Sequence, residues 1–103
     1  MVEIRFSPEA LSDLKEIKSY IKEELLNEQA ADNTIEEILK HIRKLSDFPQ
    51  SGAPLSSVVG IETNYRFIVS GNYTAFYNYE NDSVFILRVL YGRRDYMRIL
   101  FGE

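Results

Sequence analysis

The stretch 65-YRFIVSGNYTAFYNYENDSVFILRVLY-91 decides the fold, because apolar and polar residues alternate over much of its length. It contains three segments rich in the aromatic and β-branched residues that are typical of strands: 65–70, 73–79 and 83–91. Gly71-Asn72 and Asn81-Asp82 separate these segments, and such residues tolerate the positive φ that tight hairpin turns need. The stretch therefore predicts a three-stranded antiparallel meander. Its last strand is apolar on both faces, which predicts a central strand or one covered on both sides.

The chain before the meander predicts one strand and a helical hairpin. In 2-VEIRFS-7 every second residue is apolar, as in a half-buried strand. Ser7 and Pro8 then suit the N-cap and the first position of a helix. Two apolar stripes with helical spacing follow: Leu11, Leu14, Ile17, Ile21 and Leu25 in a helix from Pro8 to about Leu26, and Ala31, Ile35, Ile38, Ile42 and Leu45 in a second helix. The second helix ends by Asp47, because Pro49 disfavours helical conformation in the residue before it.

The remaining segments complete one domain. The segment 48–60 is rich in Pro, Gly and Ser, which predicts a loop with room for one short extended piece. After the meander, 93–101 fits either a short helix or an extended tail. The predicted order is β-α-α-β-β-β with a short C-terminal tail, an α+β fold in which the helical hairpin covers one face of the sheet. With 103 residues, no internal repeat and no linker, residues 1–103 are expected to form a single domain.

The composition excludes several kinds of function. The chain has no cysteine, which rules out disulfides and thiol chemistry, and its one histidine, His41, is expected at the surface or rim of the second helix. Neither a G-x-S-x-G motif nor a glycine-rich phosphate loop is present. No apolar run is long enough to span a membrane, and no segment has the features of a signal peptide. We therefore expect a cytoplasmic protein without a metal or cofactor.

The charged residues are distributed unevenly. Residues 1–50 hold eleven acids and seven bases and residues 51–103 hold five of each, for a net charge of −4. This acidity argues against non-specific binding of nucleic acid. The bases of the second half are all arginines, whose planar guanidinium groups match phosphate or carboxylate oxygens: Arg66, Arg88, Arg93, Arg94 and Arg98. These arginines either form an anion-binding site or pair with acids, of which Glu62, Glu80 and Asp95 are candidates.

Taken in order along the whole chain, these features resemble the RelE/ParE superfamily of type II toxin–antitoxin toxins. The resemblance depends on the opening strand, the helical hairpin and three later stretches: 45-LSDFPQSG-52, 65-YRFIV-69 and 84-VFILRVLYGRRDY-96. It implies a cognate antitoxin, whose disordered segment would fold onto the sheet and the arginine region. Tyr73, Tyr77 and Tyr79 share one strand face and are candidates either for contact with the antitoxin or for packing under the hairpin.

The superfamily implies two alternative activities. RelE-like members cleave mRNA in the ribosomal A site without a metal, whereas ParE-like members inhibit DNA gyrase without catalysis. In the first mechanism a base helps the ribose 2′-OH attack its phosphodiester, arginine stabilises the negative phosphorane, and an acid protonates the leaving oxygen. In the second, the arginines are largely structural. A third alternative is a member that has lost its toxicity and only binds its antitoxin.

The nuclease hypothesis assigns catalytic roles to four residues. Arg66 matches the arginine that opens the second-half strand in RelE-like nucleases. Arg93 or Arg94 resembles the arginine after their last strand, and Tyr96 lies roughly where they have a C-terminal tyrosine. Tyrosine is a weak base at neutral pH unless neighbouring arginines lower its pKa. The resemblance thus predicts a site of Arg66, Arg93, Arg94 and Tyr96.

Two features of the chain favour the gyrase alternative. RelE-like nucleases are strongly basic, whereas this chain has no lysine after Lys44 and is acidic overall. In addition, 87-LRVLYGRRD-95 is similar to the ParE-type ending. We take ribosome-dependent mRNA cleavage as the first hypothesis, with the ribosome and mRNA as partners, and DNA gyrase as the alternative partner.

Overall fold

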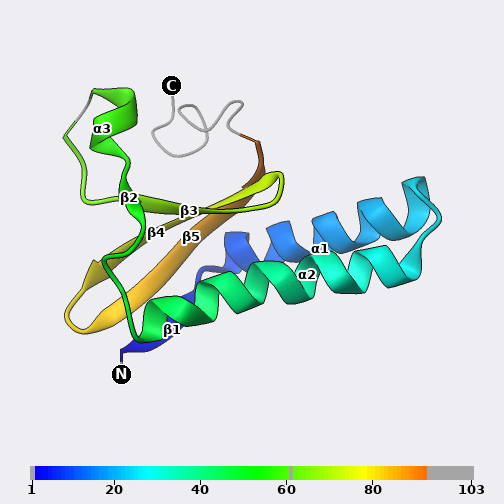
Figure 1. Ribbon diagram of the computed structural model, residues 1–103, viewed down its shortest axis with the longest axis horizontal. Helices are drawn as coiled ribbons and strands as arrows, with labels where there is room; N and C mark the ends of the chain where they lie inside the picture. Colours follow the sequence, from blue (N-terminus) through cyan, green and yellow to red (C-terminus); the bar gives the residue numbers. More distant parts are fainter. Residues whose placement is uncertain (1, 61, 93–103) are drawn as a thin grey trace.

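The computed structural model describes residues 2–60 and 62–92, which contain a five-stranded sheet with a helical hairpin against one face (Figure 1). The strands are β1 (Glu3–Phe6), β2 (Ala53–Pro54), β3 (Arg66–Ser70), β4 (Tyr73–Glu80) and β5 (Ser83–Tyr91). The helices are α1 (Pro8–Glu24), α2 (Glu28–Arg43), the 3-10 turn η1 (Lys44–Ser46) and the short α3 (Ser56–Val59). The predicted α+β class and the order of the main elements are confirmed.

Strands β3, β4 and β5 form the predicted antiparallel meander. Gly71 has a φ of +60° in the first turn, and Asn81 and Asp82 have φ values of +52° and +60° in the second, as a type I′ turn requires. The sheet order is β1-β5-β4-β3-β2, so the apolar β5 lies between two neighbours, as predicted. β1 pairs with β5 in parallel, which makes the sheet mixed.

The first residue after β1, Ser7, joins the start of α1 to the edge of β5. Ser7 caps the helix, because its Oγ accepts a hydrogen bond from the backbone N–H of Ala10 at 2.9 Å. The same hydroxyl donates to the carbonyl oxygen of Leu87 at 2.7 Å, and the Ser7 N–H donates to that of Ile86 at 2.9 Å. The cap therefore also fixes the beginning of α1 against β5.

A β-bulge in β5 changes which of its residues face the helices. Ile86 and Arg88 lie opposite consecutive residues of β4, so Leu87 between them is an extra residue. A regular strand would place Ile86, Arg88 and Leu90 on one face. Instead, Ile86 belongs to the core under the hairpin, whereas Leu90 packs against the cluster on the opposite face.

Two apolar clusters, one on each face of the sheet, form the core. The larger lies under the hairpin: Ala10, Ile38, Ile42, Leu45, Ala75, Tyr77, Val84, Ile86 and Val89. The smaller consists of Leu55, Phe67 and Phe76. The apolar stripe predicted for α2 largely faces the core. The stripe predicted for α1 is wrong in part, because Leu11 and Leu25 are 50% and 60% exposed. Ala10 and Asp13 are buried on α1 instead, so the buried face is rotated relative to the prediction.

The segment 48–60 has more structure than the sequence predicted. Its short extended piece, β2, pairs with β3, and the Leu55 N–H donates to the carbonyl oxygen of Tyr65 at 2.9 Å. The turn α3 follows, on the side of the sheet away from the hairpin (Figure 1). The predicted tail, 93–101, lies outside the described residues. Within the described part of the chain, no helix is both long and apolar enough to cross a membrane.

Candidate functional site

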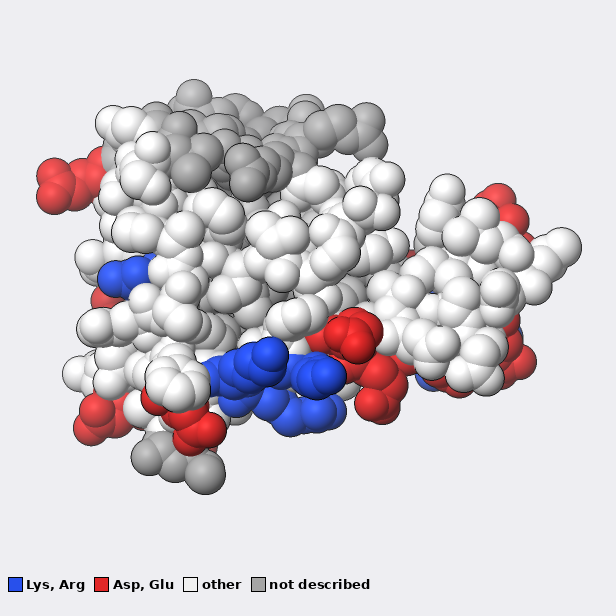
Figure 2. Space-filling model, in the orientation of Figure 1, with Lys and Arg blue, Asp and Glu red and all other residues white. Residues whose placement is uncertain are grey.

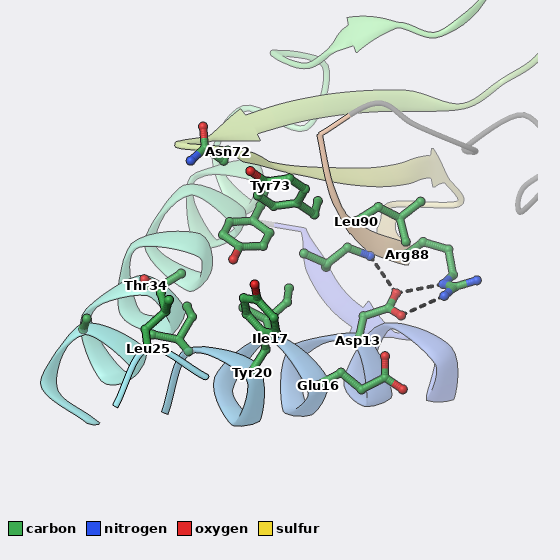
Figure 3. Close-up of a pocket in the computed structure, with 14 residues that line it drawn as sticks. Asp13, Glu16, Ile17, Tyr20, Leu25, Thr34, Asn72, Tyr73, Arg88 and Leu90 are labelled. Atoms are coloured by element: carbon green, nitrogen blue, oxygen red, sulfur yellow. Dashed lines mark hydrogen bonds and ion pairs between the residues drawn. The ribbon is translucent and has the colours of Figure 1, made fainter. Parts of the chain in front are cut away.

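A groove of about 900 Å³ lies between the helical hairpin and one end of the sheet (Figure 3). Its walls are the middle and end of α1, the first half of α2, the start of β4 and the last residues of β5. The groove exists because the hairpin extends beyond the sheet that it covers (Figure 1). A concave site lined largely by apolar and aromatic side chains is typical of ligand and peptide recognition.

Three tyrosines and a leucine line the apolar end of the groove. The rings of Tyr73 and Tyr91 meet edge to face, with centroids 5.5 Å apart. Tyr20 and Leu25 extend from the opposite wall and are 59% and 60% exposed. Burial raises the pKa of the Tyr73 phenol, and the nearby phenols of Tyr91 and Tyr20 raise it further. Tyr73 therefore stays neutral at physiological pH, and this end of the groove suits an apolar partner.

The other end of the groove carries an ion pair between a helix and the sheet. Arg88 Nε and Nη2 donate to Asp13 Oδ2 and Oδ1 at 2.8 and 2.7 Å, which is a bidentate arrangement (Figure 3). The Val89 N–H donates to Asp13 Oδ2 at 2.9 Å. The hydrogen bond with Asp13 raises the pKa of Arg88 despite the opposing effect of burial. Both carboxylate oxygens of Asp13 accept hydrogen bonds, so this residue joins α1 to β5 and is poorly placed to act as a base.

Asp13 was not among the site residues predicted from the sequence, although one signal could have identified it. Asp13 lies three residues after Ala10 and four before Ile17, at the spacing of residues on one helix face. A carboxylate on the apolar face of a helix needs a buried partner. Arg88, the only charged residue within the apolar run 84–91, was the natural candidate. Arg88 thus pairs with an acid that was not among the candidates considered from the sequence.

Arg66, the one predicted catalytic residue within the described chain, binds a loop. We call residues 49–52 the pinned loop. Arg66 Nη1 donates to the carbonyl oxygens of Gly52 and Gln50 at 2.7 and 3.3 Å. Arg93, Arg94 and Tyr96 lie outside the described residues, so the predicted four-residue site stays a prediction.

The Tyr77 hydroxyl makes two hydrogen bonds with the backbone of the pinned loop. It donates to the carbonyl oxygen of Pro49 at 2.8 Å and accepts from the Gly52 N–H at 3.0 Å. Burial raises the pKa of this phenol, although the Gly52 N–H and the charge of Arg66 act in the opposite direction. The Tyr77 phenol, on the residue opposite Arg66 in the sheet, is therefore buried and neutral, and it cannot serve as a base at physiological pH.

Within the described residues, the remaining titratable candidate, His41, forms no catalytic set with other groups. His41 lies at the rim of α2, with Nδ1 2.9 Å from the carbonyl oxygen of Glu37 and 3.0 Å from Ser70 Oγ. Its predicted position at the surface or rim is thus confirmed. Among residues 2–60 and 62–92, no three His, Cys, Asp or Glu side chains group as metal ligands do.

Comparison with known families identifies the class of protein. The family described as the ParE toxin of the type II toxin–antitoxin system parDE matches residues 4–96. The chain therefore belongs to the ParE toxin family, within the RelE/ParE superfamily that the sequence resembles. Membership implies a cognate antitoxin as partner. No curated protein matches the chain.

Two solved structures share the fold. One is from the chromosomal ParDE toxin–antitoxin system of P. aeruginosa, with a TM-score of 0.76 and 19% identity over 90% of this chain and 98% of that one. The other is YafQ from E. coli strain BL21(DE3), with a TM-score of 0.51 and 18% identity over 99% of this chain and 100% of that one. At these identities the likeness extends to the fold and not to individual site residues.

Proposed function

We propose that this ParE-family toxin arrests growth by binding DNA gyrase without catalysing a reaction. The observation that carries this proposal is the bonding of Arg66. Both short contacts of its Nη1 go to carbonyl oxygens of the pinned loop, and the adjacent phenol of Tyr77 is buried and neutral. Arg66 therefore acts as a structural clamp, in keeping with the role of the arginines in ParE-like members. The proposed place of action is the bacterial cytoplasm.

The groove supports a second part of the same proposal, which concerns how the antitoxin binds the toxin. An antitoxin segment that folds on binding needs a concave apolar surface to offset its loss of conformational entropy. The groove offers Tyr20, Leu25, Tyr73 and Tyr91 for this purpose. We propose that an amphipathic antitoxin segment binds there, with its apolar side chains against the tyrosines.

A specific observation keeps mRNA cleavage as a second candidate. The Arg66 side chain is only partly buried, and its contacts with the pinned loop use Nη1, which leaves the donors of Nε and Nη2 for a phosphate. In that case Arg66 would stabilise the phosphorane, and Arg93, Arg94 and Tyr96 would supply the remaining groups.

Pulse labelling distinguishes the two functions. The toxin is expressed without antitoxin, and incorporation of labelled thymidine and methionine is followed over the first minutes. Binding to gyrase predicts that thymidine incorporation falls first and that purified toxin with gyrase linearises supercoiled plasmid. If methionine incorporation falls first and mRNA is cut, the gyrase proposal is wrong and the nuclease candidate replaces it.

The variant Arg66→Met adds an independent test. Methionine keeps much of the side-chain length while removing the guanidinium donors. If Arg66 is only a clamp, Arg66→Met still arrests growth once its stability has been shown by thermal unfolding to be adequate. A catalytic Arg66 predicts instead that the folded variant loses activity by a factor of 100 or more, on the order of the effect of removing one transition-state donor.

A further inference from the structure

The connection between α1 and α2 is an exposed apolar projection, which we call the hairpin tip (residues 22–28). Every residue of the tip is exposed. Leu25 and Leu26 are 60% and 86% exposed, and Leu26 is the most exposed large apolar residue in the described chain. The connection between the two helices lies beyond the end of the sheet (Figure 1). Unlike Leu25, which also lines the groove, Leu26 takes no part in the groove described above.

The backbone conformation of Leu26 is unfavourable for a leucine, so the stability of the fold does not explain why a leucine occupies this position. Leu26 has a φ of +50° directly after the C-cap of α1, Leu25. Glycine is the usual residue at this position, because a side chain in the left-handed region is disfavoured. Leu26 thus has an unfavourable backbone and almost no burial in the isolated toxin. A residue that breaks two local rules at once is a candidate for a role in binding.

The charges around the tip indicate what kind of partner it meets. Glu23, Glu24 and Glu28 surround the leucines, whereas Lys22 is the one base of the tip and lies 3.8 Å from Glu28. In Figure 2 the visible face of this end of the hairpin is mostly uncharged, with acidic side chains along its edges. Carboxylates repel phosphate, so nucleic acid is a poor partner. They favour a protein whose apolar pocket is rimmed by lysine or arginine.

The shape of the tip distinguishes a folded target from an antitoxin segment. A segment that folds on binding lies in a groove, and the groove between hairpin and sheet serves this need. The tip is convex and needs a pocket that is already formed. We propose that the hairpin tip inserts Leu26 into a basic-rimmed apolar pocket on the folded protein that the toxin inhibits. The proposed function names that protein as gyrase, and the inference depends on it only for this name.

The test compares one substitution at two exposed leucines. Leu26→Gln removes the apolar tip, whereas Leu11→Gln makes the same change on α1, where Leu11 is 50% exposed. Burying a leucine is worth at least one factor of ten in affinity. We therefore expect Leu26→Gln to weaken growth arrest and binding to purified gyrase about tenfold or more, and Leu11→Gln to leave both unchanged. Thermal unfolding and affinity for the cognate antitoxin are measured for both variants and stay near those of the wild type.

A second variant keeps the outcome clear if glutamine perturbs the fold. Leu26→Gly suits the positive φ, so it is expected to unfold at the same or a higher temperature while losing as much activity as Leu26→Gln. Full toxicity of both folded variants would overturn the proposal, as would a loss confined to antitoxin binding. If the wild type does not bind gyrase and the Leu26 variants still lose toxicity, the tip proposal stands and the target named above is wrong.

Discussion

Tyr77 and Gly52 are packed so closely that the side chain of Tyr77 restricts position 52 to glycine. A Cβ added at Gly52 would lie 2.5 Å from the Tyr77 hydroxyl oxygen and 2.8 Å from the carbonyl oxygen of Phe67, so only glycine fits. From the sequence, Tyr77 is a candidate either for antitoxin contact or for packing under the hairpin. Packing is correct, since Tyr77 is fully buried. Alternation placed the three tyrosines of β4 on one face, but it could not tell which of them the hairpin and loop would cover.

Removing the Tyr77 hydroxyl should destabilise the fold. In Tyr77→Phe the buried Gly52 N–H and the partly buried Pro49 carbonyl lose their hydrogen-bond partner. We expect the free energy of unfolding to fall by about 1–3 kcal/mol, measured by urea denaturation. Tyr79→Phe on the same strand face is the control, with an expected change within about 0.5 kcal/mol. Equal stabilities of the two variants would contradict the role of the hydroxyl.

The raised pKa of Tyr77 also predicts how stability depends on pH. Above about pH 10 the unfolded tyrosine loses its proton while the folded one retains it. The unfolded state then binds fewer protons, so stability is complete below pH 10 and falls as pH rises through the folded pKa. Denaturation between about pH 8 and 11 should show a steeper decline for the wild type than for Tyr77→Phe. Parallel curves would rule out this contribution of Tyr77, because Tyr73 titrates in both proteins.

The contact between α1 and β5 joins elements that are distant in the sequence. Asp13 and Arg88 are 75 residues apart, and Ser7 and Leu87 are 80 apart. The meander and its turns were predictable because their signals are local. The parallel pairing of β1 with β5, the bulge at Leu87 and the rotation of the buried face of α1 depend on contacts between distant segments, which periodicity along one segment does not contain.

The Asp13–Arg88 contact should stabilise the packing of α1 on β5. Asp13→Ala leaves a partly buried guanidinium and the Val89 N–H without their acceptor, and we expect a loss of about 2–3 kcal/mol. Glu16→Ala, in the next turn of the same helix, is the control with little expected change. A double-mutant cycle with Arg88→Ala measures the coupling directly, and a coupling energy near zero would show that the contact adds nothing to stability.

On the scale of the whole molecule, the two surfaces proposed for binding lie together where the hairpin extends beyond the sheet (Figure 1). The groove and the hairpin tip share this end, whereas Arg66 lies at the start of β3, opposite Tyr77 in the register of the sheet. The sequence predicted an arginine site, which stays a prediction, and it could not reveal the groove, whose walls come from both helices and two strands. Its residues Tyr20, Leu25 and Tyr91 looked like ordinary members of amphipathic elements.

The groove residues should control binding of the antitoxin without affecting the fold. Tyr20→Ala removes an exposed aromatic ring from the groove, and Phe48→Ala removes one that is 67% exposed elsewhere. We expect Tyr20→Ala to weaken binding of the antitoxin about tenfold, measured by calorimetry, with no more than a small change in thermal stability. An equal effect of Phe48→Ala would mean that the groove is not the site of contact.

Because β1 pairs in parallel with β5, the first strand of the chain cannot find its partner until β5 has been synthesised. Ser7 meets Leu87 only after 80 further residues have been added, which takes about 4 to 16 s at the usual rate of 5–20 residues per second. During this interval the helical hairpin can form, but the apolar face that the sheet will cover remains open to water. A newly made chain therefore passes through a partly folded stage in which its exposed apolar surface makes it prone to aggregation. Substitutions that weaken the sheet should lower the yield of soluble protein before they alter the affinity of the mature toxin for any partner.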